Sequence, residues 1–281
     1  MKEVMLDVIN LVREFPVQGA AKEVVRAVDD VSFSVYEGEA LGLVGESGSG
    51  KSTTARCMLR LIEPTSGSVL YRGRNILRMG KRDLKAFRRE AQLVFQDPYS
   101  SLDPKMRVGD IISEGLQIHF PRMSRDEVNT ELKQLLSLVG LREDHLNRFP
   151  ESFSGGERQR IGIARALAVK PSLLVCDEPV ASLDVSIQAQ VLNLFQELKE
   201  RLGLTIVFIA HDLATVRHLC QRVAVMEQGV IREIGPRDEI YTNPQHPYTR
   251  SLIAAVPDPD PKSEREKLRR RQAKVTGGSS S

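Results

Sequence analysis

The chain has 281 residues, which is enough for one large domain with a substantial buried core. Hydrophobic residues make up 41% of the chain and charged residues 27%, the ordinary composition of a soluble protein. The net charge, 40 − 37 = +3, is too small to argue for a nucleic-acid partner. A solvated surface of mixed sign is therefore favoured.

The cysteine spacing and the hydropathy argue against a disulfide-rich, zinc-binding or membrane-spanning protein. Cys57, Cys176 and Cys220 are widely spaced and form no C-x-x-C pair, so neither a disulfide framework nor a zinc knuckle is indicated. We expect each to be a small buried residue in a reducing compartment. The N-terminus shows no apolar signal region, and no apolar run approaches the roughly 18 residues of a membrane helix. If the protein works on a membrane, another chain must span it.

The first 40 or so residues alternate apolar and polar side chains, as in Met5–Ile9 and Val31–Val35. This pattern predicts strands with one exposed face. Glu37-Gly38 indicates a turn, and the short apolar run Ala40–Val44 predicts a strand buried on both faces. A helix should follow and end at Pro64–Gly67, where a hairpin begins.

Residues 97–168 have helical periodicity, and Ser124 to Glu127 form a capping-box pattern ahead of one apolar stripe. Strand patterns then return at Leu173–Cys176, Thr205–Ala210 and Val223–Met226. An amphipathic helix around Ile187–Leu202 separates the first two of these. Apolar strands alternating with helices predict a parallel α/β sheet into which the helical stretch is inserted.

The phosphate-binding motif G-x-x-x-x-G-K-[ST] is matched in full between the buried strand and the next helix. Its residues are Gly45, Glu46, Ser47, Gly48, Ser49, Gly50, Lys51 and Ser52. Glycines allow successive N–H groups to turn toward phosphate oxygens, and the helix N-terminus adds positive charge. Lys51 should reach the β- and γ-phosphates and the Ser52 hydroxyl should bind Mg²⁺. A plain strand-to-helix turn with a surface lysine is the alternative.

Two adjacent acids follow the strand Leu173–Cys176, at the carboxyl edge where open α/β sheets bind ligands. Asp177 is expected to hold Mg²⁺ through water, and Glu178 to polarise the attacking water as general base. These residues could also cap the start of a helix with Pro179 in its first turn, an alternative that is compatible with the first.

With these motifs in place, Phe153–Arg160 (FSGGERQR) resembles the signature of the ATP-binding subunits of ABC transporters, usually begun with Leu rather than Phe. The resemblance covers nearly the whole chain. It implies a P-loop NTPase core with a mostly parallel sheet at residues 1–96 and 169–240, N-terminal antiparallel strands, and a helical subdomain at 97–168. A family C-terminal segment at 241–256 would complete an ATPase domain of residues 1–256, followed by a charged, disordered tail at 257–281.

The resemblance also implies roles for single residues. Nucleotide contacts are expected along residues 45–52 (the Walker A motif) and from Thr53. Gln96 is similar to the Q-loop glutamine that touches Mg²⁺ or water, Asp184 to the D-loop aspartate, and His211 to the switch histidine that contacts γ-phosphate. Phe15 is the expected adenine-stacking aromatic, although Val17–Val24 separates it from the next strand.

As a mechanism, the resemblance implies that two such domains, identical or related, pair head to tail around ATP. Ser154, Gly155 and Gly156 would grip γ-phosphate in the other chain's site, and the helical subdomain would pass the motion to membrane-spanning permease subunits. The chain would lie peripherally on the cytoplasmic face of the cell membrane and serve a substrate-binding protein indirectly.

Two stretches are similar to importers of oligopeptides, dipeptides and nickel: Phe95–Pro104 (FQDPYSSLDP) and Asn243–Arg250 (NPQHPYTR). His246 serves there as a recognition mark without assigned chemistry. No cysteine follows Cys220, so we expect no iron–sulfur cluster, as in the cluster-free partner of a two-subunit pair. The C-terminal region is short for the family, so the chain could also be half of a tandem fusion.

Two other classes of protein also carry a phosphate loop. A soluble ABC ATPase acting on nucleic acid or ribosomes typically adds a coiled coil, zinc modules or a second ATPase domain, and none is recognisable here. A P-loop kinase or GTPase is disfavoured by the Ser154–Arg160 segment and by His211. We therefore expect no nucleic-acid partner.

Overall fold

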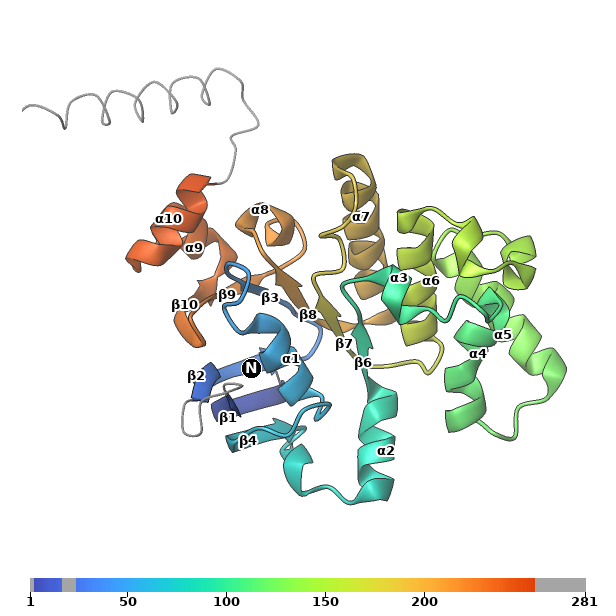
Figure 1. Cartoon of the computed structure of the whole chain (residues 1–281), viewed down its shortest axis with the longest axis horizontal. Helices are drawn as coiled ribbons and strands as arrows, with labels where there is room; N and C mark the ends of the chain where they lie inside the picture. Colours follow the sequence, from blue (N-terminus) through green and yellow to red (C-terminus); the bar gives the residue numbers. More distant parts are fainter. Residues whose placement is uncertain (1–2, 17–23, 256–281) are drawn as a thin grey trace, which may run out of the picture.

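A computed structural model describes residues 3–16 and 24–255 (Figure 1). Most of the stretch expected to separate Phe15 from the next strand, residues 17–23, lies outside the described residues, as does the expected tail at 257–281. The described chain forms two sheets with helices packed between and around them.

The smaller sheet is antiparallel and comes mainly from the N-terminal region. Its order is β2-β1-β4-β5, with β1 at Val4–Pro16, β2 at Val24–Tyr36, β4 at Ser66–Tyr71 and β5 at Arg74–Asn75. The apolar residues Leu6, Val8 and Leu11 of β1 are buried, and a β-bulge between Val8 and Leu11 interrupts the alternation. The predicted antiparallel N-terminal strands are confirmed.

The larger sheet has the order β10-β9-β3-β8-β7-β6 and carries the phosphate-loop strand β3 near its centre. The strands are β3 (Ala40–Val44), β6 (Ala91–Val94), β7 (Leu173–Asp177), β8 (Thr205–Ala210), β9 (Arg222–Glu227) and β10 (Val230–Pro236). All neighbours pair in parallel except β10, which is antiparallel to β9. The predicted α/β fold with a mostly parallel sheet is confirmed.

Successive residues of the central strands face two different cores, because side chains alternate along a strand. Leu41 and Leu43 of β3 pack into the core between the two sheets, whereas Ala40 and Val44 pack toward the helices of the opposite face. This two-sided burial explains why the strand sequences are continuously apolar.

Some helices form a group on one side of the molecule, and the others are spread around the two sheets (Figure 1). Between β6 and β7 lie α3 (Pro98–Ser101), α4 (Val108–His119), α5 (Arg125–Leu138) and α6 (Gly155–Leu167), with short 3-10 turns at Glu143–Asn147 and Pro150–Ser152. The others are α1 (Lys51–Met58), α2 (Lys81–Glu90) after a 3-10 turn at Ile76–Arg78, α7 (Val185–Leu202), α8 (Leu213–Val216), α9 (Arg237–Thr242) and α10 (Pro247–Ala255). The α3–α6 group and the α9–α10 pair lie at opposite ends of the molecule (Figure 1).

The start of α5 agrees with the sequence pattern, whereas the end of α1 does not. Ser124 and Glu127 form the predicted capping box of α5. The helix after the phosphate loop, however, ends at Met58 rather than at Pro64, so that expectation was wrong. Arg60 adopts φ 49° and the amides of Leu61 and Ile62 turn back to the Arg56 carbonyl, which closes the helix one turn early.

The burial of the cysteines and the character of the described helices bear on two further expectations. Cys57, Cys176 and Cys220 are all buried, as predicted. Across residues 3–16 and 24–255, none of the helices combines the length and apolar character that crossing a bilayer requires.

Candidate active site

The phosphate loop joins β3 to α1, and two of its glycines are required by close backbone approach. A Cβ on Gly45 would lie 2.0 Å from the Met226 carbonyl oxygen, and one on Gly50 would lie 2.1 Å from the Ala27 carbonyl oxygen. Gly50 also adopts φ 100° directly before α1. No residue with a side chain fits either position without displacing the backbone.

Lys51 is buried at the start of α1 and bends back over the loop. Its Nζ donates to the carbonyl oxygens of Gly45 (2.7 Å) and Glu46 (2.8 Å) and lies 3.5 Å from Glu178 Oε1. Burial lowers the pKa of Lys51 from its ordinary value, and the Glu178 carboxylate opposes that shift. The ammonium is thus held inside the loop where a phosphate oxygen can meet it.

Ser52 and Asp177 bring the phosphate loop and the acidic strand end together. The Ser52 hydroxyl donates to Asp177 Oδ1 at 2.7 Å, although the two residues are 125 positions apart. Burial raises the pKa of Asp177, and the hydrogen bond from Ser52 works against that change. A hydroxyl beside a carboxylate is an oxygen pair of the type that Mg²⁺ prefers.

Glu178 follows β7 in a backbone conformation that residues with side chains rarely adopt, with φ 45°. Its carboxylate lies between two side chains: Oε1 faces Lys51, and Oε2 accepts a hydrogen bond from Gln96 Nε2 at 3.1 Å. No helix begins here among the described residues, because α7 starts at Val185. The left-handed turn directs this carboxylate toward the phosphate loop.

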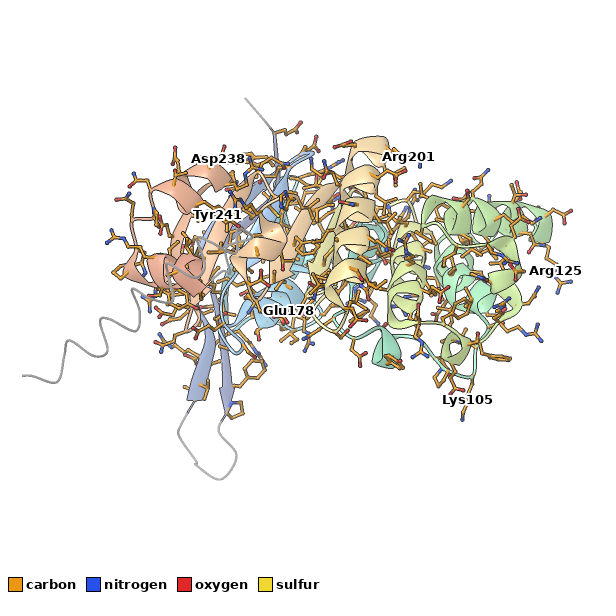
Figure 2. The ribbon with its side chains drawn as sticks, turned by 90° about the horizontal axis from the view of Figure 1, so that it is seen from above. Lys105, Arg125, Glu178, Arg201, Asp238 and Tyr241 are labelled. Carbon is orange, nitrogen blue, oxygen red and sulfur yellow. The ribbon has the colours of Figure 1, made fainter. Side chains whose placement is uncertain are left out.

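Lys51, Ser52, Gln96 and Glu178 line one cavity of about 220 Å³, whereas Asp177, which accepts the hydrogen bond of Ser52, is not among its lining residues. Its lining residues are Ala27, Ser47, Gly48, Gly50, Lys51, Ser52, Thr53, Gln96 and Glu178. Figure 2 shows Glu178 near the middle of the long axis, between the end that carries Tyr241 and the end that carries Arg125. Four predicted features, the phosphate loop, Thr53, Gln96 and Glu178, therefore meet at one place.

Phe15 and His211 are not among the described residues that line this cavity. The Phe15 ring is half-buried near the end of β1, with the Arg13 guanidinium 4.5 Å from its centroid. Phe15 pairs with Val25, two residues before the cavity residue Ala27. His211 follows β8 and lies 3.2 Å from Asp212, measured from Nε2 to Oδ2.

The signature residues lie outside the cavity as well, at the start of α6. The Ser154 hydroxyl and Glu157 form a capping box, and hydrogen bonds from Ser154 lower the pKa of Glu157. A Cβ on Gly156 would lie 2.5 Å from Ile187, so this glycine permits close packing of α6 against α7. Asp184 precedes α7 at its N-cap position. Within one chain, the signature thus faces the D-loop segment rather than the phosphate loop.

Two arginines of α6 contact residues on both sides of Gln96. The Arg158 guanidinium lies 3.7 Å from the Tyr99 ring centroid, and the Arg165 guanidinium lies 5.6 Å from that of Phe95. Arg165 also donates to the Ser101 carbonyl at 2.5 Å. In such cation–π contacts the positive guanidinium is attracted to the electron-rich face of the aromatic ring.

Sequence reasoning missed two residues at this site. Ala27 borders the cavity through its backbone, so no chemically distinctive side chain could announce it. No function was predicted for Tyr248, yet its hydroxyl accepts a hydrogen bond from the Glu46 amide at 3.1 Å. Its signal was the Asn243–Arg250 motif, which marked a family but no chemistry.

A strand–loop–helix phosphate site beside an acidic strand end, on a mostly parallel sheet, defines a P-loop NTPase. The family model for ABC transporters matches residues 28–181, and the chain belongs to that family. A second model, for the oligopeptide/dipeptide transporter C-terminal region, matches residues 232–280. The predicted family is confirmed.

Curated relatives and solved structures agree with this assignment. The chain is 51% identical to the oligopeptide transport ATP-binding protein OppF of Bacillus subtilis strain 168, over 96% of this chain and 88% of that protein. It is 48% identical to OppF of Escherichia coli strain K12, over 95% and 81%. Among solved structures, the dimeric post-hydrolysis state of the ATP-binding cassette MJ0796 bound to ADP and Pi matches with TM-score 0.75 and 28% identity, covering 83% of this chain and 99% of that one.

Proposed function

We propose that this chain is the ATP-binding and ATP-hydrolysing subunit that energises a membrane importer of oligopeptides or dipeptides. The convergence of Lys51, Ser52, Gln96 and Glu178 on one cavity carries the proposal. The cargo class rests on relatives named for oligopeptide and dipeptide transport. None of these names points to the alternative, a soluble ABC ATPase acting on nucleic acid or ribosomes.

In this proposal the phosphates of ATP enter the loop at residues 45–53, where backbone N–H groups and the N-terminus of α1 favour negative charge. Lys51 is already confined there and needs little rearrangement to meet the β- and γ-phosphates. Phe15 stacks on adenine, which is supported by its place on β1 across from the strand that carries Ala27.

The Ser52–Asp177 pair fits Mg²⁺, because both groups offer oxygen and lie 2.7 Å apart. Ser52, Asp177 and Gln96 would hold the ion, which when bound would neutralise charge on the β- and γ-phosphate oxygens. The residues of the chain do the rest. Glu178 removes a proton from the attacking water, and the Gln96 amide orients the Glu178 carboxylate.

The remaining residues act through a second chain. Ser154, Gly155 and Gly156 lie away from the cavity of their own chain, which supports a role in a partner's site in a head-to-tail pair. Asp184 and His211 would complete each site when the pair closes. A solved relative described as dimeric and bound to ADP and Pi supports this arrangement. Membrane permease subunits would hold the pair at the cytoplasmic face of the membrane.

Glu178→Gln tests the catalytic role. The amide keeps the shape of the side chain but cannot accept the proton of water, so ATP binding should persist while turnover falls at least about a hundredfold. Binding is measured by calorimetry and turnover by phosphate release. Glu200→Gln, which changes an exposed carboxylate on α7, is the matched control. Hydrolysis by Glu178→Gln at the rate of the unmodified protein would rule out this base.

The transport role is tested separately. The chain, expressed with its genomic neighbours, should co-purify with membrane-spanning permease subunits, and its loss should abolish peptide uptake by cells. Co-purification with ribosomes or DNA instead would overturn the importer assignment while leaving the ATPase chemistry intact.

A further inference from the structure

The segment Asn243–Arg250 has no part in the chemistry above, yet it touches the phosphate loop. The Tyr248 hydroxyl, on the first turn of α10, accepts the hydrogen bond of the Glu46 amide at 3.1 Å. Tyr248 is half-buried, and burial raises the pKa of its phenol above the ordinary value, so it stays neutral. A C-terminal side chain thus contacts the nucleotide site from outside.

The peptide group it contacts is held at both ends. The N–H of the Gly45–Glu46 peptide donates to Tyr248, and the carbonyl of the same peptide accepts from Lys51 Nζ at 2.7 Å. A peptide beside glycine is the easiest kind to rotate, because glycine has few steric restrictions. Rotation of this one would turn the carbonyl away from the ammonium. The hydrogen bond of Tyr248 thus restrains the peptide that supplies one of the two carbonyl acceptors of Lys51.

The polar residues around Tyr248 serve to seat it. Glu233 on β10 accepts hydrogen bonds from the amides of Gln245 (2.8 Å) and His246 (3.0 Å). Burial opposes ionisation of Glu233, but these hydrogen bonds lower its pKa, so it carries a full charge at neutral pH. His246 Nδ1 in turn accepts from the Tyr248 amide at 3.2 Å and caps the first turn of α10.

Arg250 closes the same turn from the other side. Its guanidinium donates to the carbonyl oxygens of Pro244 (3.0 Å) and Gln245 (3.1 Å). Amides and carbonyls of the turn are thus both satisfied by side chains. These hydrogen bonds hold the turn in the conformation that places the Tyr248 hydroxyl against the loop.

We propose that Tyr248 is a positioning residue for ATP binding, and that the Asn243–Arg250 turn exists to brace the phosphate loop through the Gly45–Glu46 peptide. The inference rests on the proposed function, because it assigns Tyr248 to the same nucleotide site. It gives the family motif around His246 a physical role: the histidine caps the helix, and the tyrosine two residues later holds the loop.

Tyr248→Phe removes the hydroxyl and keeps the ring. Loss of one net hydrogen bond should weaken MgATP binding by roughly threefold to tenfold in calorimetry of the full chain. Tyr241→Phe is the matched control, because it removes a hydroxyl that bonds the Leu213 carbonyl in the same region without touching the loop. Its ATP affinity should stay within about twofold of the unmodified protein. Amide exchange at Glu46, followed by NMR, should accelerate in Tyr248→Phe alone.

A purely structural role for Tyr248 would lower the unfolding midpoint without changing Glu46 exchange, and that result would overturn the brace. Unchanged ATP affinity in Tyr248→Phe would overturn it too. Arg250→Ala, at an exposed position, loosens the turn from a distance and should weaken ATP binding in the same direction. If the unmodified chain bound no ATP, the proposed function itself would fail. Glu46 amide exchange would still test whether the Tyr248 hydroxyl protects that amide.

Discussion

At the scale of single residues, the phosphate loop requires glycine at position 45, because a Cβ atom there would clash with neighbouring atoms. Gly45 leaves room for the Met226 carbonyl, which a Cβ would approach to 2.0 Å, and for Ser49 Oγ at 2.8 Å. Because the closer neighbour is backbone of β9, it cannot rotate away as a side chain would. The loop is therefore packed against the sheet as tightly as a core residue.

Gly45→Ala should accordingly destabilise the protein by about 1–3 kcal/mol and weaken ATP binding, since relief of the clash must move the loop or β9. Gly162→Ala is the contrasting substitution. It lies in α6 with no atom within 4 Å of the added Cβ, and should be neutral or slightly stabilising. Urea unfolding measures the stability of both variants, and calorimetry measures their ATP affinity. Equal stability of the two would contradict the close approach.

At the scale of elements, α5 and α6 begin with the same device. Ser124 with Glu127, and Ser154 with Glu157, form capping boxes in which the carboxylate accepts hydrogen bonds from its serine. These bonds lower the pKa of both Glu127 and Glu157. The signature serine is therefore held at the start of α6 by an ionised neighbour.

This arrangement predicts the direction of a pH effect. A carboxylate with a lowered folded-state pKa adds stability above the ordinary glutamate value of about 4.3, and that contribution disappears as the pH falls through the lowered value. Glu157→Gln keeps a capping side chain without the charge. The stability of this variant should fall less steeply below about pH 4.3 than that of the unmodified protein, as followed by urea unfolding at several pH values. Identical slopes would contradict an ionised cap.

At the scale of the whole molecule, the phosphate loop and the Ser154–Gly156 segment, the two halves of the proposed composite site, lie in separate places on one chain. Lys51 lines the cavity, whereas Ser154 lies at the start of α6 and does not line it. A single chain can thus bind phosphate at one place and offer a helix N-terminus at another. Two chains arranged head to tail would bring the halves together twice.

Complementation tests this arrangement. Lys51→Ala should weaken nucleotide binding, and Ser154→Arg should block the partner's site by bulk and charge, so each alone should lose most ATPase activity. Mixing the two variants should restore part of it, because one site of the mixed pair then combines an intact loop with an intact signature. Phosphate release by the mixture measures the recovery. No recovery, with both proteins folded and paired, would overturn the head-to-tail model.

The parts of the structure that could be predicted were those with a periodic or chemically specific pattern. β3 and β8 ended where their apolar runs end, and the loop, Gln96 and Glu178 converged on one cavity. The end of α1 could not be predicted, because the apolar side chains of Leu59 and Ile62 keep the helical spacing on either side of Arg60, where the backbone turns. The contribution of Ala27 depends on backbone position, which spacing in one sequence does not reveal.

The two arginine–aromatic contacts on α6 also constrain how this family can vary. Arg165 holds both the Phe95 ring and the Ser101 carbonyl, while Arg158 holds Tyr99 between them. A residue inserted between Phe95 and Ser101 would put at least one of these partners out of register. Natural variation in this stretch should therefore preserve its length more strictly than its composition, and deletions here should be rarer than substitutions.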